Sequence, residues 1–583
     1  MLNIIQSYSI SMLYTTGVRW VLVLLAGYIL IKSIRSLLST RATPEVWAYL
    51  HIENGDSLPI THWENVIGRS SSVDLRIKDK SVSRNHSLLI RNKDGTWIYE
   101  DLGSTNGSSI NDEEANEREK MLCEIGDEIK MGSVSCTLFP ISLEEQKNNK
   151  QMREMDKEPV SPWKIIVALS FFQILTVIQL IIGLGDRYIP MVSVSFFILM
   201  LIMWFYVFGF RALGSRGFEL EIMAFFLSTI SLAIVASSAP EMVFKQLIAI
   251  GIGIVLFVFM CIFLRNLKRA KFIRPMLIIL SVAILVVNLV FGTLKYGAVN
   301  WLEIGGISFQ PSEIVKLAFI WIGAATLDEL YQKRNLTIFM VFSGFCLASL
   351  AIMGDFGTAS IYFVTFLLIS FLRSGDVSRM ALTIGGAILL GIMVIRFKPY
   401  IADRFSAWGH VWEFADSLGY QQTRTMTASA NGGLAGLGAG NGMLRHVAAA
   451  NTDLVFGMVV EEWGIIIAAL MVLCIIALLL FTSNSILAGR STFYSIAACG
   501  ATTMLIFQTM LNVFGALDFF PLTGVTFPFV SHGGTSMAVS WGMLSFLKAA
   551  DMRKNASLAI NNRVKNIIVD KDISEEDEVG LDA

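Results

Sequence analysis

The chain has 583 residues, of which 54% are hydrophobic and only 16% are charged, whereas about 25% of the residues of an ordinary soluble protein are charged. This composition excludes a purely soluble globular enzyme. The formal net charge of −1, from 46 basic and 47 acidic side chains, gives no sign of a nucleic-acid partner. The charge is concentrated near the two ends of the chain, which predicts a small soluble part attached to a large membrane body.

The first predicted element is an apolar segment from about Met12 to Ile31, which is long enough to span a bilayer. It ends in Lys32 and Arg35 without a small-residue cleavage site, so we interpret residues 1–43 as a retained membrane anchor. The basic flank predicts that the N-terminus lies outside and the following part in the cytoplasm. Arg19, within the segment, is expected to extend its side chain toward the outer interface.

Residues 44–140 show short runs rich in β-branched and aromatic residues, separated by turn signals such as Asn54-Gly55 and Asn106-Gly107. This pattern is typical of a β-sandwich. Three loop motifs then follow one another. They are Gly68-Arg69-Ser70, Ser83-Arg84-Asn85-His86 and Gly103-Ser104-Thr105-Asn106-Gly107.

In this order the three motifs resemble the forkhead-associated (FHA) domain, and the resemblance covers the whole module. Guanidinium, hydroxyl and turn N–H groups are the donors that suit a phosphate. The resemblance implies that five residues contact phosphothreonine, while His86 and Gly107 hold the loops. The five are Arg69, Ser83, Arg84, Thr105 and Asn106. The alternative is a β-sandwich that has kept the scaffold and lost the ligand.

Residues 141–163 are rich in charge and poor in apolar side chains, so we interpret them as a solvated linker. Twelve apolar segments follow, and with the anchor they predict about 13 transmembrane helices. They lie near residues 164–184, 191–210, 219–238, 243–264, 275–293, 311–327, 335–353, 357–372, 380–396, 455–481, 493–513 and 533–549. We divide this body into two extra spans at 164–210 and a core at 211–549, followed by an acidic, cytoplasmic tail at 550–583.

Basic residues recur in every second loop, and the last of these groups begins at Lys548. This is the distribution expected of cytoplasmic loops. This threading places the β-sandwich and the C-terminus in the cytoplasm. It places the segments 295–310, 397–455 and 515–531 outside, where polar residues next to spans are candidates for a functional site.

The polar motifs of these outer segments follow a fixed order. They are Trp301–Gly306, Gln310-Pro311-Ser312-Glu313-Ile314-Val315-Lys316, Gly354-Asp355-Phe356-Gly357, Thr452-Asp453, Glu461-Glu462-Trp463-Gly464 and Thr523–Ser536. Together they resemble the SEDS family (shape, elongation, division and sporulation) of the FtsW/RodA/SpoVE type, over roughly residues 219–549 and about ten spans. The resemblance implies a peptidoglycan glycosyltransferase that polymerises lipid II at the outer face of the bacterial cytoplasmic membrane.

By this resemblance, Asp453 occupies the position of the essential aspartate and is the expected general base of an inverting transfer. Cationic side chains are expected to assist the pyrophosphate leaving group, with Lys316 first among them. The candidate substrate contacts are Gln310, Glu313, Lys316, Arg404, Arg424, Arg445 and Ser531. A divalent cation, Mg²⁺ or Mn²⁺, is a candidate helper without assigned ligands. The alternative is that Glu313, Lys316 and Glu461 or Glu462 form a structural ion-pair network.

Some positions depart from the family pattern. Ala448 to Asn451 stand where a Pro-Glu pair and a His are usual, His532 stands where Tyr is common, and Asp355 where Pro is common. The glycine run 436–442 follows no predicted strand, so it is not a nucleotide-binding loop. We interpret it as a flexible outer loop that admits bulky lipid-linked sugars.

The two resemblances together imply a membrane enzyme whose partners are lipid II, a class B penicillin-binding protein and a phosphothreonine protein downstream of a Ser/Thr kinase. Division, elongation and sporulation remain open as settings. Two other functions stay open as well. One is a flippase or transporter of lipid-linked sugars, which would depend on charges near the middle of the membrane. The other is a non-catalytic membrane scaffold that recruits division or sporulation proteins through the FHA module.

Overall fold

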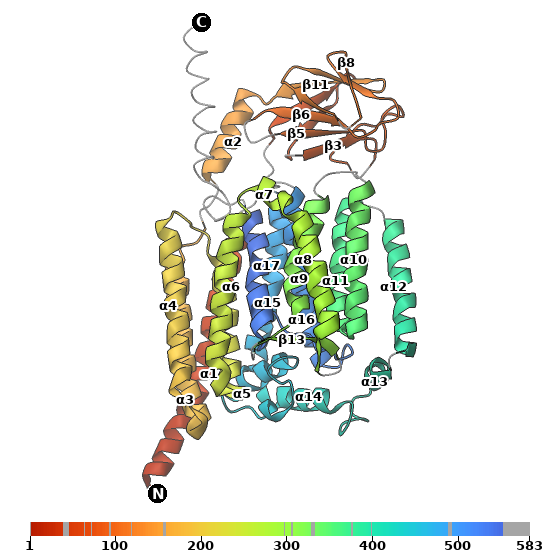
Figure 1. Cartoon of the computed structure of the whole chain (residues 1–583). Coiled ribbons are helices and arrows are strands. Elements are labelled where there is room, and N and C mark those ends of the chain that lie inside the picture. The colour runs from red at the N-terminus through yellow and green to blue at the C-terminus, as the bar shows by residue number, and fades with distance from the viewer. Residues whose placement is uncertain are drawn as a thin grey trace.

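The computed structural model describes residues 2–38, 46–62, 64–70, 73–91, 95–117, 119–155, 159–295, 298–304, 307–327, 333–374, 377–397, 399–487 and 492–551. A small β domain lies at one end of a body of long helices (Figure 1). The predicted combination of a polytopic helical body and an all-β module is confirmed.

The β domain consists of two sheets that pack face to face. The strands are β1 (Ala48–Ile52), β2 (Ser57–Ile60), β3 (Glu64–Gly68), β4 (Leu75–Arg76), β5 (Ser87–Arg91), β6 (Trp97–Asp101), β7 (Ser108–Ile110), β8 (Glu113–Ala115), β9 (Lys120–Cys123), β10 (Glu128–Met131) and β11 (Val134–Pro140). One sheet has the order β2-β1-β11-β10-β7-β8 and the other β4-β3-β5-β6-β9. Alternate residues of β1 and β6 are buried, as expected of strands with one face in a core. The core includes the fully buried Leu50, Leu89 and Tyr99.

The charged linker contains a helix, α2 (Leu143–Met155), which packs against the β domain. Ser142 and Glu145 form a reciprocal cap at its start: the Glu145 N–H donates to Ser142 Oγ at 3.2 Å, and the Ser142 N–H donates to the Glu145 carboxylate at 3.0 Å. Tyr49 of β1 donates to the same carboxylate at 2.6 Å. The linker was predicted only as a solvated segment, because its composition shows the charge but not this docking.

Nine helices in the described part of the chain are long and apolar enough to cross a membrane. They are α1 (Leu2–Leu38), α3 (Trp163–Leu184), α4 (Pro190–Ala212), α5 (Glu219–Ser238), α6 (Val243–Phe263), α8 (Arg274–Phe291), α10 (Lys333–Met353), α15 (Val455–Leu487) and α16 (Thr492–Ala516). Helices α9 (Pro311–Leu327), α11 (Phe356–Ser374), α12 (Val377–Phe397) and α17 (Gly534–Ala550) occupy the other four predicted segments. The total of about 13 spans therefore stays a prediction.

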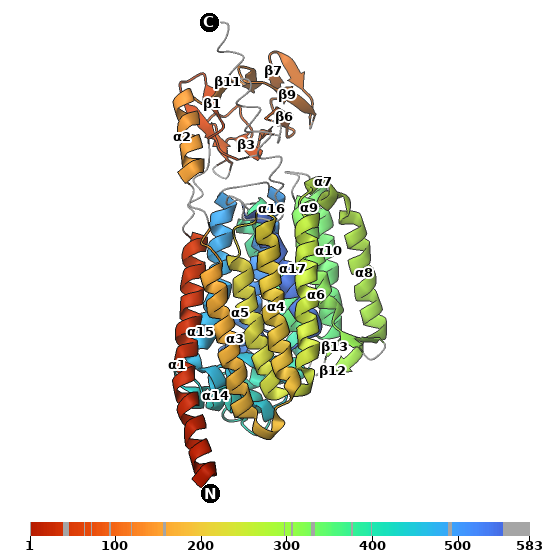
Figure 2. The ribbon, with the colours of Figure 1, turned by 90° about the vertical axis from the view of Figure 1, so that its left-hand side faces the viewer.

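Helix α5 is enclosed by its neighbours, since its whole apolar window is buried. Helices α1, α3 and α4 cover one side of it, and α1 also packs against α15 (Figure 2). A buried ion pair joins α5 to α17: Lys548 Nζ lies 2.9 Å from the Glu221 carboxylate, which also accepts from Tyr206 at 3.0 Å. Lys548 was predicted to lie in a cytoplasmic loop, but its ammonium group is enclosed between helices.

The three segments predicted to lie outside gather at the end of the helical body opposite the β domain (Figure 1). A small sheet of β12 (Thr293–Lys295), β13 (Ala298–Ile304) and β14 (Ile307–Phe309) lies there, with α13 (Pro399–Ala407), α14 (Tyr420–Gly432) and the short turn η3 (Leu444–His446). The short helix α7 (Leu267–Phe272) lies at the other end. Here β3 contacts the body, because Thr492 of α16 donates to the Glu64 carboxylate at 2.9 Å.

Candidate active site

The segment that carries Asp453 is fixed to the loop between α16 and α17. The amide of Asn512 donates to the carbonyls of Asp453 at 2.9 Å and Val525 at 2.8 Å. The Ser531 hydroxyl donates to the Thr452 carbonyl at 2.6 Å, and the His532 N–H donates to the Asn451 carbonyl at 2.8 Å. Ser531, a predicted substrate contact, therefore uses its hydroxyl proton to hold the backbone next to Asp453.

The Asp453 carboxylate faces Gly524. A Cβ atom at position 524 would lie 3.4 Å from Asp453 Oδ2, and Gly524 has a φ of 72°, which favours glycine. The pKa of Asp453 is raised to about 6, mainly by burial and to a smaller extent by the negative charge of Asp355, whereas the Thr452 hydroxyl and the Arg404 guanidinium act against the rise. Arg404 is itself positioned by donating to the Leu522 carbonyl at 2.9 Å.

Asp355 connects three elements of the site. It begins α11, where its Oδ1 accepts from the Thr358 N–H at 3.0 Å as an N-cap. Its Oδ2 accepts from Asn300 of β13 at 2.8 Å and from Gln310 at 3.1 Å. Asp355 was not among the predicted site residues, although it belongs to one of the motifs that resemble the SEDS family and was noted as a departure from the family pattern. Its place before an apolar helical run is the signal that could have marked it as a cap.

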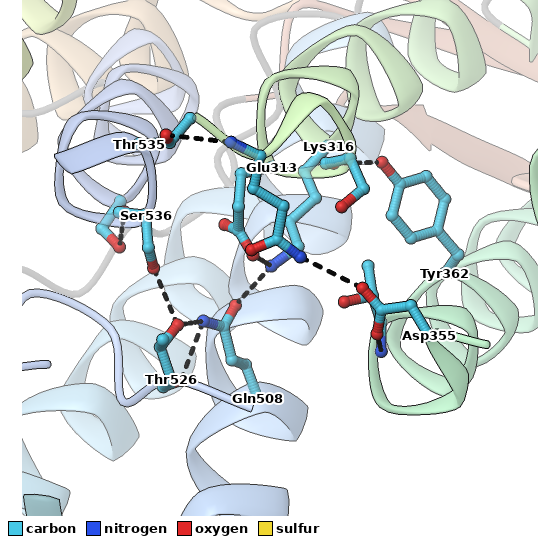
Figure 3. A network of polar contacts seen from close by, with 12 residues as sticks. Glu313, Lys316, Asp355, Tyr362, Gln508, Thr526, Thr535 and Ser536 are labelled. Atoms are coloured by element: carbon cyan, nitrogen blue, oxygen red, sulfur yellow. Dashed lines mark hydrogen bonds and ion pairs between the residues drawn. The ribbon is translucent and has the colours of Figure 1, made fainter. Parts of the chain in front are cut away.

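A buried polar network runs from α9 to α17, as Figure 3 shows. Lys316 Nζ lies 2.6 Å from the Glu313 carboxylate and donates to Gln508 at 3.1 Å. Gln508 in turn donates to the Thr526 carbonyl at 2.9 Å, and the Thr526 and Ser536 hydroxyls lie 2.8 Å apart. The Lys316 side chain is fully buried. Its charge is therefore neutralised by Glu313 rather than directed to open space.

The glycine run is held tightly by the start of α15. The Glu461 carboxylate accepts from the N–H groups of Met443 and Leu444, both at 2.9 Å, and Glu462 accepts from the Gly440 N–H at 3.0 Å and from the Ser237 hydroxyl. These two carboxylates thus hold backbone and do not join the Lys316 pair.

Close packing explains why glycine recurs in this run. A Cβ atom at Gly436 would lie only 2.2 Å from the Glu462 carbonyl oxygen. Arg19, at the middle of α1, donates to the Gly436 carbonyl at 3.0 Å, so α1 contacts this loop. The segment is consequently packed on both sides, which differs from the predicted flexible loop.

The remaining predicted cations lie apart from the polar network around Lys316. Arg424 is exposed on α14 and its guanidinium stacks over the Tyr420 ring at 5.1 Å. Arg445 donates to the Gly440 carbonyl at 2.9 Å, and Arg187, from the turn between α3 and α4, donates to the same oxygen at 3.1 Å. Among the predicted cations, Arg404 is the one whose charge acts on Asp453.

No group of three or more His, Cys, Asp or Glu side chains that could hold a metal ion occurs in the part of the chain that the structure describes. Asp355 acts electrostatically on Asp453, but its carboxylate is occupied by three N–H donors. These residues do not fit a metal site, so we derive no chemical step through a cation.

The predicted phosphate-binding loops of the β domain meet at Ser83. Its hydroxyl accepts from the Thr105 N–H at 3.0 Å and donates to the Thr105 hydroxyl at 3.3 Å. Arg69, Arg84 and Asn106 are exposed beside them, and Asn106 donates to the Ser81 carbonyl at 2.7 Å. The arrangement exposes two guanidinium groups next to hydroxyls, which is the donor set that a phosphate requires.

His86 connects two of these loops from the interior of the β domain. It is fully buried. Its Nδ1 accepts from the Ser83 N–H at 3.1 Å, so Nε2 carries the proton and donates to the Gly107 carbonyl at 3.2 Å. Burial lowers the pKa of His86, so the ring stays neutral and keeps this arrangement at neutral pH.

The protein is a multi-pass membrane protein made of two different units. One is a helical body with a buried polar cluster near one end, and the other is a β-sandwich whose loops carry the donors that suit a phosphate. Residues 217–556 match the model of the FtsW, RodA and SpoVE proteins, described as a cell cycle protein, and residues 65–132 match the FHA domain. The chain belongs to the FtsW/RodA/SpoVE family and carries an FHA domain.

The alignments with curated relatives cover about half of this chain. The probable peptidoglycan glycosyltransferase FtsW of Moranella endobia (strain PCIT) is 30% identical over 279 residues, which cover 45% of this chain and 72% of the relative. The protein of the same name from Bacillus subtilis (strain 168) is 29% identical over 330 residues, covering 53% and 80%. A solved chain from work on the coordination of polymerization and crosslinking by a peptidoglycan synthase complex has a TM-score of 0.49 and 22% identity, covering 57% of this chain and 96% of that one.

Proposed function

We propose that this chain is a peptidoglycan glycosyltransferase that polymerises lipid II into glycan strands. Membership of the FtsW/RodA/SpoVE family and relatives named as probable peptidoglycan glycosyltransferases support the reaction class. The observation that carries the proposal is the environment of Asp453, which lies just before α15: Asn512 of α16 holds its backbone carbonyl, its carboxyl group faces Gly524, and its pKa is about 6.

Asp453 has the properties of a general base for this transfer. With a pKa of about 6 it is mainly ionised at neutral pH, and it is a stronger base than an exposed aspartate. It takes the proton from the acceptor's 4-hydroxyl as that oxygen attacks the anomeric carbon, and the bond from this carbon to the lipid pyrophosphate breaks on the opposite face. Arg404 is the first candidate to stabilise the leaving pyrophosphate.

The other predicted substrate contacts divide into residues that position the site and residues that are candidates for direct contact with the substrate. Gln310 and Ser531 position the walls of the site through Asp355 and Thr452. The pair of Glu313 and Lys316 supports the same wall from within the body. Arg424 and Arg445 lie on α14 and η3 and are candidates for contacts to the sugar-peptide part of a large substrate.

The direct test is polymerisation of purified lipid II by the full chain with its partner transpeptidase. Asp453→Asn keeps the size of the side chain and removes the base, so we expect glycan synthesis to fall by at least about a hundredfold. Asp416→Asn is the matched control, because Asp416 is an exposed aspartate of the same outer segment. Equal polymer from the Asp453 variant and the wild-type chain, both folded by thermal melting, would exclude Asp453 as the base.

We propose that the FHA domain binds a phosphothreonine segment of a protein that a Ser/Thr kinase modifies. Arg69, Ser83, Arg84, Thr105 and Asn106 supply the contacts, and His86 keeps their loops in place. In this proposal the FHA domain faces the cytoplasm, the N-terminus and Asp453 lie outside, and a class B penicillin-binding protein contacts the spans and outer loops.

Binding of phosphothreonine peptides to the full chain tests this part separately. Arg69→Ala should abolish detectable binding, while Lys120→Ala, an exposed cation on β9, should leave it unchanged. An unphosphorylated peptide should not bind either protein. Unchanged affinity in the Arg69 variant contradicts the assignment, and it would leave the transferase proposal untouched.

A further inference from the structure

An apolar groove of about 560 Å³ lies between α8 and α10 on the outside of the helical body. Its walls are Ile278 and Val282 of α8 and Thr337, Ile338, Val341, Phe342 and Phe345 of α10. Phe342 is almost fully buried and forms the floor, whereas Val341 is 68% exposed at the rim. The groove is therefore a built hollow in the lipid-facing surface rather than a gap inside the core.

Helix α8 lies at the edge of the body, where it packs against α9 and α10. Only 17% of its apolar window is buried, the smallest share among the nine long apolar helices of the described residues. Figure 2 shows α8 at the edge of the bundle, outside α10. A helix so placed leaves apolar side chains of both α8 and α10 in need of a partner, and in a bilayer an acyl chain supplies it.

The groove lies toward the FHA end of these two helices. Ile278 comes one turn after Arg274, the first residue of α8, and Val282 comes one turn later still. Residues four apart share one helix face, so Arg274 lies on the same stripe as the groove wall. Helix α10 also begins at this end, with the sequence Lys333-Arg334.

The charge at this end suits an anion. The α7 segment carries Arg269, which is exposed, and α8 begins at Arg274 without an acidic residue in its first turn. A cation at a helix N-terminus is disfavoured by the helix dipole, so helix stability does not account for Arg274. Within the described residues, no carboxylate forms an ion pair with Arg274.

We propose that the groove between α8 and α10 binds one anionic phospholipid of the leaflet that faces the FHA domain. An acyl chain lies along Ile278, Val282 and Val341, and the phosphate headgroup lies at Arg274 and Arg269. Basic pockets between transmembrane helices on the cytoplasmic side bind anionic headgroups in this way. The groove is separate from the site around Asp453, which lies at the opposite end of the body.

Native mass spectrometry of the full chain, purified and titrated with phosphatidylglycerol or phosphatidylcholine, tests the headgroup. We expect phosphatidylglycerol to bind preferentially and Arg274→Gln to lower its affinity about fivefold. Arg211→Gln, at the end of α4, is the matched control and should retain wild-type affinity. Equal retention of the two lipids by the wild-type chain, or an unchanged Arg274 variant, overturns the proposal.

A large side chain that fills the groove provides a second test of the proposal. Ile278→Trp should remove the bound phospholipid, whereas Ile252→Trp, on the exposed face of α6, should not. A photo-crosslinking residue at position 341 identifies the occupant in membranes. A phospholipid adduct supports the proposal, while an adduct to a second copy of the chain or to another protein's helix shows that the groove is a protein interface and refutes it.

Discussion

The acidic limb of the pH profile of glycan synthesis should report the ionisation of Asp453. Burial raises the pKa of this carboxyl to about 6, and only the ionised form accepts the proton of the attacking hydroxyl. Activity is therefore present above pH 6 and is lost as the pH falls through that value. Two neighbours act in opposite directions, since Arg404 lowers the pKa and Asp355 raises it.

The magnitude follows from the ionisation equilibrium. With a pKa of about 6, roughly 90% of Asp453 is ionised at pH 7 and roughly 10% at pH 5, so the rate should fall about ninefold between them. Arg404→Gln removes a favourable charge and should move the midpoint upward. Asp355→Asn removes an unfavourable charge and should move it downward, while the amide retains an oxygen that can accept hydrogen bonds.

The assay is the initial rate of lipid II polymerisation from pH 5 to pH 8 in detergent, with thermal melting at each pH to exclude unfolding. Asp416→Asn serves as the control, because Asp416 is exposed in the segment between α13 and α14 and should not move the midpoint. A midpoint that stays in place in both the Arg404 and Asp355 variants, or a flat profile between pH 5 and pH 7, would refute Asp453 as the titrating base.

Two further substitutions test the contacts that hold the site together. Lys316→Met leaves the Glu313 carboxylate buried without its partner and should lower the unfolding free energy by about 3–5 kcal/mol. Lys316→Met combined with Glu313→Leu should recover most of this loss. Thermal unfolding in detergent measures both variants, and equal losses in the single and double variants would contradict the pairing. Gly436→Ala places a Cβ atom 2.2 Å from the Glu462 carbonyl at a φ of 81° and should lower both the melting temperature and the polymerisation rate, whereas Gly385→Ala meets open space and should change neither.

The sequence was most informative where chemistry is local. The FHA loops are short motifs, and Ser83 and Thr105 of two of them contact each other, as do His86 and Gly107. The pair of Glu313 and Lys316 was predictable as well, because helical spacing places them on one face.

Contacts between distant segments could not be predicted in the same way. Asp355 binds Asn300 and Gln310 only because α11 begins beside the small sheet. Lys548 pairs with Glu221 across 327 positions of the chain, and its sequence context suggested an ordinary cytoplasmic flank. Periodicity and composition describe single elements, and they do not tell which elements pack together.

The extra helices at the N-terminal side show what such packing adds to the function. Helix α1 has 37 residues and is about 55 Å long at 1.5 Å per residue. Near its middle Arg19 donates to the Gly436 carbonyl, and near its C-terminal end Ser36 contacts Glu219 and the Val160 N–H, shortly before the FHA domain begins. The same glycine run is bound by the helix that follows Asp453, because the Gly440 N–H donates to the Glu462 carboxylate and the Leu437 N–H donates to the Glu461 carbonyl. The two extra spans at 164–210 carried no predicted chemistry, yet they contact this glycine run as well, because Arg187, between α3 and α4, donates to the Gly440 carbonyl at 3.1 Å.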